Sequence, residues 1–150
     1  MMATSADAGN FVFGLGADNI LDDGTDGTAA IALEYHSDPF YVRGRLDVGW
    51  GTAVQVNDAN DLFLGVGLSA EYTLSQSWFF EASLMPGYYG PGSNGTDLGG
   101  NFHFRTLVGF GYNLTEKDAI SIAIEHRSNA SIEDRNPGTE ALMIRYRKRF

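Results

Sequence analysis

The stretch YVRGRLDVGWGT at residues 41–52 decides the fold class, because its side chains alternate in character with a period of two residues. Successive side chains of a β-strand point to opposite faces, so this period predicts a strand. The apolar face consists of Val42, Leu46, Val48 and Trp50, and the charged face consists of Arg43, Arg45 and Asp47. A strand of this kind separates an apolar environment from a polar one.

The same alternation recurs along the chain, most clearly at residues 62–72 and 102–112. No stretch approaches the roughly 18 consecutive apolar residues that a membrane-spanning helix needs. The pattern therefore predicts an all-β protein with eight strands, at residues 11–17, 29–35, 41–52, 62–72, 78–88, 102–112, 119–128 and 140–150.

The connections between these strands alternate in length. Those at residues 37–39, 75–77 and 115–117 are short, and those at 21–27, 54–60, 90–101 and 131–138 are long and rich in Gly, Asp and Asn. Even strand numbers with short turns at one end and longer loops at the other are typical of outer-membrane barrels. We expect residues 1–150 to form one domain, an eight-stranded antiparallel transmembrane β-barrel with short periplasmic turns and longer extracellular loops.

Alternation alone does not say which face looks inward, because a soluble lipid carrier of lipocalin shape would exchange the two sets. The charged face is also the glycine-rich one, which suits the narrow interior of eight strands. Its charges have both signs, so they can pair where water is scarce. The predicted lumen holds Arg43, Arg45, Arg105, Arg127, Arg145 and Arg147 with Asp47, Glu71, Glu81 and Glu125. Aromatic side chains near the strand ends form the predicted girdles of the apolar outer wall: Tyr35, Trp50, Tyr72, Trp78, Tyr112 and Tyr146.

The overall composition excludes several classes of protein. The 150 residues carry a formal charge of -9, which argues against binding to a nucleic acid backbone. The absence of cysteine excludes a disulfide scaffold and thiol catalysis. The 13% aromatic content argues against a disordered chain.

Three polar residues fall on the outer, lipid-facing side of the last two strands. By strand parity His126 and Ser128 share this face with isoleucines, and Glu140 shares it on the neighbouring strand. Residues 126–128 come just before the last loop and Glu140 just after it, so the hairpin brings them together. The set predicts a serine esterase: Ser128 attacks an ester carbonyl, His126 takes its proton, and Glu140 orients the imidazole. Asn129 is a candidate side-chain donor to the oxyanion, and no metal or cofactor is needed.

A residue motif supports this hypothesis. The run His126-Arg127-Ser128-Asn129-Ala130, followed by Asn136, Gly138 and Glu140, resembles the C-terminal signature of the PagL family of outer-membrane lipid A 3-O-deacylases. The resemblance implies a Ser-His-Glu triad on the outer wall. It also implies hydrolysis of the 3-position acyl ester of lipopolysaccharide lipid A, in the bacterial outer membrane and surrounded by its lipid. The chain departs from the family pattern at Arg127, where the pattern has an aromatic residue, and at Ser131, where it has glycine.

Several alternatives remain open from the residues alone. A polar side chain near the membrane rim costs only about 0 to 1 kcal/mol, so a non-catalytic barrel, structural or adhesin-like with ligand-binding acidic loops, fits the same strands. The amide of Ser131 is a second candidate for the oxyanion hole. Phe102, outward at the same rim, could contact an acyl chain or serve only as a girdle aromatic.

Overall fold

The computed structural model describes residues 9–21 and 27–150, and within them it contains nine antiparallel β-strands. None of the described residues forms a helix long or apolar enough to cross a membrane. The strands are β1 (Asn10–Asp18), β2 (Thr28–His36), β3 (Tyr41–Arg43), β4 (Leu46–Asn57), β5 (Leu62–Thr73), β6 (Trp78–Gly90), β7 (Phe102–Asn113), β8 (Asp118–Ser128) and β9 (Thr139–Arg149).

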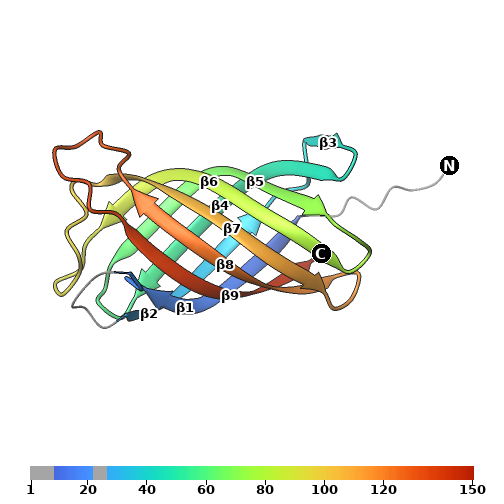
Figure 1. The fold of residues 1–150 in the computed structure, drawn as a ribbon, viewed down its shortest axis with the longest axis horizontal. Coiled ribbons are helices and arrows are strands. Elements are labelled where there is room, and N and C mark those ends of the chain that lie inside the picture. The colour runs from blue at the N-terminus through green and yellow to red at the C-terminus, as the bar shows by residue number, and fades with distance from the viewer. Residues whose placement is uncertain (1–8, 22–26) are drawn as a thin grey trace.

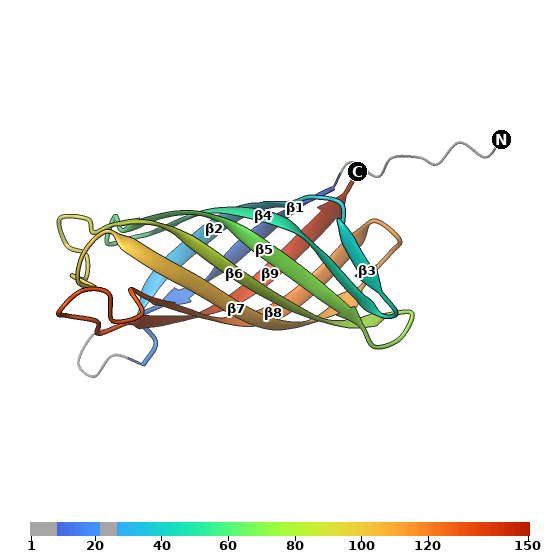
Figure 2. The ribbon, with the colours of Figure 1, turned by 90° about the horizontal axis from the view of Figure 1, so that it is seen from above.

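Eight of these strands close into a barrel. Each of β4 to β9 pairs with its neighbour, β9 pairs with β1, β1 with β2, and β2 with β4. The barrel is long, and the start of β1 and the C-terminus lie at the end opposite the long loops after β6 and β8 (Figures 1 and 2). The predicted fold, an eight-stranded antiparallel barrel, is confirmed, and most predicted strands agree with the observed ones to within two residues.

The segment at residues 41–52 is not one strand, contrary to the prediction. The chain reverses at Gly44, whose φ is +63°, so that β3 folds back on β4 with Tyr41 opposite Val48. A two-residue turn leaves the alternation intact on each arm, so a test for a period of two does not detect it. As a consequence Arg43 and Arg45 are exposed and do not enter the lumen.

The extracellular loops also differ from prediction at one place. Strand β4 continues to Asn57, so the connection to β5 spans only residues 58–61 and is short. Val54 and Val56 point outward while Gln55 is buried between them, which shows that the alternation outweighs the loop-like composition of the segment. The long connections after β6 and β8 are confirmed, at residues 91–101 and 129–138. Residues 22–26 of the first predicted long loop lie outside the described residues.

The predicted division of the two faces is confirmed for the eight barrel strands. The girdle aromatics are exposed on the outer wall, and the lumen contains ion pairs of buried side chains. Arg105 bonds Glu34 at 2.7 Å and Glu125 at 2.8 Å, and its side chain is fully buried. Further pairs extend this set at both ends, giving an alternating series that we call the lumenal charge chain: Asp18, Arg127, Glu125, Arg105, Glu34, Arg145 and Glu81. Because every arginine in it has two carboxylate partners, the interior charge is largely compensated.

Candidate active site

The extracellular ends of β8 and β9 bring His126 and Glu140 together. The two residues are direct cross-strand partners, and both side chains lie on the outer wall. Nδ1 of His126 donates to Oε1 of Glu140 at 2.8 Å. An ionised carboxylate only accepts hydrogen bonds, so Nδ1 carries the hydrogen and Nε2 of the neutral ring presents a lone pair. This tautomer is the one that a general base acting through Nε2 requires.

Ser128 lies two residues farther along β8, on the same outer face as His126. Two residues on one face of a strand are about 6.5 to 7 Å apart along the chain, a span that an imidazole and a hydroxyl can bridge. Ser128 is partly exposed, and its hydroxyl forms no hydrogen bond to any residue in the described ranges 9–21 and 27–150. Its Oγ atom is therefore free of partners within these ranges.

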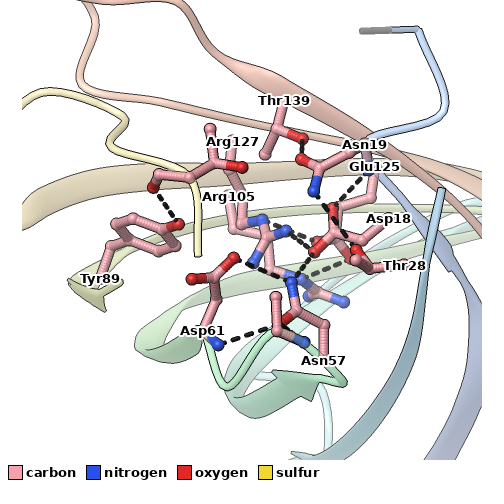
Figure 3. Close-up of polar contacts among 12 residues, drawn as sticks. Asp18, Asn19, Thr28, Asn57, Asp61, Tyr89, Arg105, Glu125, Arg127 and Thr139 are labelled. Atoms are coloured by element: carbon pink, nitrogen blue, oxygen red, sulfur yellow. Dashed lines mark hydrogen bonds and ion pairs between the residues drawn. The ribbon is translucent and has the colours of Figure 1, made fainter. Parts of the chain in front are cut away.

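The residues next to Ser128 point into the barrel and hold the strand from inside. The guanidinium of Arg127 is buried, pairs with Asp18 and Glu125, and lies 5.9 Å from the ring centre of Tyr89 (Figure 3). His126 and Ser128 are therefore the two outward neighbours of a residue that is fixed to the lumenal charge chain. This gives the segment a rigid support of the kind that precise sites require.

Asn129 is also buried, and its side chain is committed to the loops. Nδ2 donates to the carbonyl oxygens of Gly99 at 2.7 Å and Arg135 at 2.6 Å. The sequence had led us to expect that this side chain donates to an oxyanion. Both of its hydrogens are used by the loop carbonyls, so it is not placed to do so. Instead it ties the loop at residues 129–138 to the loop at residues 91–101.

The turn after Asn129 presents two backbone amides near the serine. Ala130 and Ser131 have φ of +53° and +60°, and the N–H of Ile132 bonds the carbonyl of Asn129 at 3.1 Å. Two central residues with positive φ are typical of a type I′ turn and are unusual for side chains other than Gly, Asn or Asp. Among the described residues no acceptor bonds the N–H of Ala130 or of Ser131.

Three residues near the site were assigned no function from the sequence. Asn136 accepts the N–H of Asn129 at 2.9 Å and donates to Oγ of Ser131 at 3.4 Å, so it supports the turn. Phe104 is the cross-strand partner of Ser128 and packs edge-on against Phe102, with ring centres 5.2 Å apart. Gly138 lies against the imidazole of His126. The quoted motif contains Asn136 and Gly138, but no periodic pattern predicts what a loop residue contacts.

An exposed ion pair links the same two loops. Nη1 of Arg135 bonds Oδ2 of Asp97 at 2.6 Å, with both side chains 66% exposed. The N–H of Gly99, which donates to Asp97 at 2.9 Å, and the Arg135 guanidinium lower the pKa of the Asp97 carboxyl below its usual range. The pair is solvated and contributes little to stability, but it shows that the two loops are in contact.

These features define a class of protein: an outer-membrane β-barrel whose hydrogen-bonded polar group faces the lipid, as an enzyme acting on membrane lipids requires. Comparisons with known proteins agree. The family model described as Lipid A 3-O-deacylase (PagL) matches residues 29–149. A comparison with the sequences of curated proteins gave no match.

Three solved structures illustrate the likeness of fold. The outer-membrane enzyme PagL is 18% identical over 93% of this chain and 98% of its own, with a TM-score of 0.71. Neisserial surface protein A is 15% identical over 95% of this chain and 96% of its own, with a TM-score of 0.59. A de novo designed transmembrane β-barrel is 14% identical over 95% of this chain and 97% of its own, also with a TM-score of 0.59.

Because the family model covers most of its length, the chain belongs to the PagL family of lipid A 3-O-deacylases. It is an ester hydrolase of the outer membrane, and its substrate is lipid A. The resemblance seen at residues 126–140 is thereby confirmed, and the non-catalytic barrel is not favoured.

Proposed function

We propose that Ser128, His126 and Glu140 are the nucleophile, general base and orienting carboxylate of this deacylase. The hydrogen bond of 2.8 Å between His126 and Glu140 on the lipid-facing wall is the observation that carries the proposal. A polar pair of this kind serves no evident packing purpose on an outer wall built of isoleucine and aromatic side chains. The free hydroxyl of Ser128 on the same face supplies the third group.

The reaction proceeds through an acyl-enzyme. Oγ of Ser128 attacks the carbonyl carbon of the 3-position ester while its proton passes to Nε2 of His126. The tetrahedral intermediate then collapses, the bond to the sugar oxygen breaks, and Nε2 returns the proton to that oxygen. Water attacks the acyl-serine with the same proton transfers and releases the fatty acid. Glu140 stabilises the imidazolium that forms in each step.

The amides of Ala130 and Ser131 are the proposed donors to the oxyanion. Their N–H groups have no partner in the described residues. Both belong to the turn that begins one residue after Ser128, which brings them near the ester carbonyl that Ser128 would attack. Removing one oxyanion donor costs an enzyme about 10²- to 10³-fold in kcat, so the support of this turn by Asn136 matters for rate. The side chain of Ser131 points to Asn136, which leaves its amide available.

The substrate approaches sideways from the outer leaflet. The triad residues flank the loop at residues 129–138, so they lie at the end of the barrel that carries the long loops. Figure 1 shows these loops at one end of the barrel, the extracellular end, which is where lipopolysaccharide resides. Phe102 is exposed on the same wall and Phe104 lies opposite Ser128. We assign these two rings to the contact with the acyl chain that is cleaved.

Replacement of Ser128 tests the proposal. We expect Ser128→Ala to reduce fatty acid release from lipid A by about 10³-fold or more, as in other enzymes that lose the nucleophile. Ser77→Ala, the same change in a periplasmic turn, is the matched control and should keep full activity. Release is measured by mass spectrometry of lipid A, and folding by heat-modifiable electrophoretic mobility. A folded Ser128→Ala protein that retains a tenth of the activity would refute the triad. A parent protein without any release would favour the non-catalytic barrel.

A further inference from the structure

Gly138 is the residue directly before β9, next to the end of the β8–β9 ladder. In this ladder His126 pairs with Glu140 and Arg127 with Thr139, which is the last pair. A Cβ atom built on Gly138 would meet the ring of His126, which lies on the outer wall, so a side chain here would crowd the site.

The imidazole of His126 fills the space that this missing side chain leaves. A Cβ atom built on Gly138 would lie 3.0 Å from Cε1 and 3.7 Å from Nε2 of His126. The first distance is shorter than ordinary van der Waals contact, so the ring would have to move. It cannot move freely, because Nδ1, the ring atom bonded to Cε1, is held at 2.8 Å by Glu140.

The backbone conformation at position 138 also favours glycine. Its φ is +69°, in the left-handed region that disfavours residues with a Cβ atom. Conformation and contact are nevertheless separable in this chain. Gly44 has a similar φ of +63°, but a Cβ built there meets no atom within 4 Å.

We propose that Gly138 is a positioning residue: by lacking a side chain it lets the His126 ring lie with Nδ1 on Glu140 and Nε2 toward Ser128. Glu140 holds the ring at Nδ1, and the space left by the missing side chain of Gly138 accommodates Cε1. This inference rests on the proposed triad, since it assigns a purpose to the ring's orientation. It deepens the proposal by adding a residue that never touches substrate.

The variant Gly138→Ala tests the inference, with Gly44→Ala as the control for backbone strain. A displacement of a catalytic group by less than 1 Å lowers kcat by about tenfold or more, so we expect that loss in Gly138→Ala. KM should stay within about twofold, because the substrate contacts are unchanged. Gly44→Ala should keep the parent kcat. Equal losses in both variants, or full kcat in Gly138→Ala, would overturn the inference.

A spectroscopic measurement separates the inference from the triad itself. The Cε1–H signal of His126, assigned through its loss in His126→Gln, should shift in Gly138→Ala, while those of His36 and His103 stay in place. In the parent, a nuclear Overhauser contact should join Hε1 of His126 to the Hα atoms of Gly138. Its absence overturns the inference even if Gly138→Ala does not fold. Neither result depends on activity. An active Ser128→Ala protein would refute the triad and the catalytic purpose of this orientation, but not the orientation of the ring itself.

Discussion

Replacement of Arg105 by methionine cuts the lumenal charge chain at its centre. The side chain is fully buried and pairs with Glu34 and Glu125 at 2.7 and 2.8 Å. After the change each carboxylate keeps one cation, since Glu34 still pairs with Arg145 at 3.0 Å and Glu125 with Arg127 at 3.4 Å. Each half of the chain is then left with one more negative than positive charge. Methionine keeps most of the side-chain volume, so the electrostatic change dominates.

The expected loss in the free energy of unfolding is about 3 to 5 kcal/mol, the range measured when one partner of a buried ion pair is removed. Urea titration of the barrel refolded in detergent micelles, followed by tryptophan fluorescence, measures it. Arg135→Met is the matched control: it breaks an arginine–aspartate pair that is 66% exposed on both sides, and it should cost far less because water screens an exposed pair.

A double variant checks the cause. Adding Glu125→Gln to Arg105→Met removes the excess negative charge from one half of the chain, so the two changes together should cost less than the sum of the single ones by at least about 1 kcal/mol. If Arg105→Met costs no more than Arg135→Met, or if the two changes are additive, the lumenal charge chain is not what compensates the buried charges.

Two further predictions concern the loops that carry the site. Asn129→Ala removes the bonds to the carbonyls of Gly99 and Arg135, so hydrogen exchange at residues 91–101 and 129–138 should accelerate together while exchange in the strands stays unchanged; unaltered exchange in the loops would contradict the role of this side chain. Arg135→Met should move the NMR titration midpoint of Asp97 up toward 3.8, but not all the way, because the Gly99 N–H still stabilises the carboxylate. The lowered pKa means that any stabilisation by this pair is present above pH 3.8 and is lost as the pH falls through the folded-state pKa; an unmoved midpoint would show that Arg135 does not act on Asp97.

The sequence predicts the barrel well because alternation is a direct record of its two environments. It fails at β3, since a two-residue turn at Gly44 preserves the alternation on both arms. It also fails at residues 54–60, where Asn and Asp suggested a loop but the outward valines continue the strand.

In the site, too, the sequence predicts some features and misses others. That His126 and Glu140 meet follows from hairpin symmetry, because both are close to the same loop. The burial of Asn129 depends on how residues 91–101 pack, and the space beside Gly138 depends on a loop conformation. Loop packing produces no repeating pattern in the sequence, so neither feature could be predicted from it.

The packed interior has a consequence for the cell that carries this protein. Phe63, Met85 and Arg105 lie in the lumen with none of their surface accessible, so bulk water entering from either end does not reach the middle of the described barrel. An enzyme whose substrate arrives laterally has no need of a channel. The outer membrane can therefore hold many copies without losing its barrier against antibiotics and detergents.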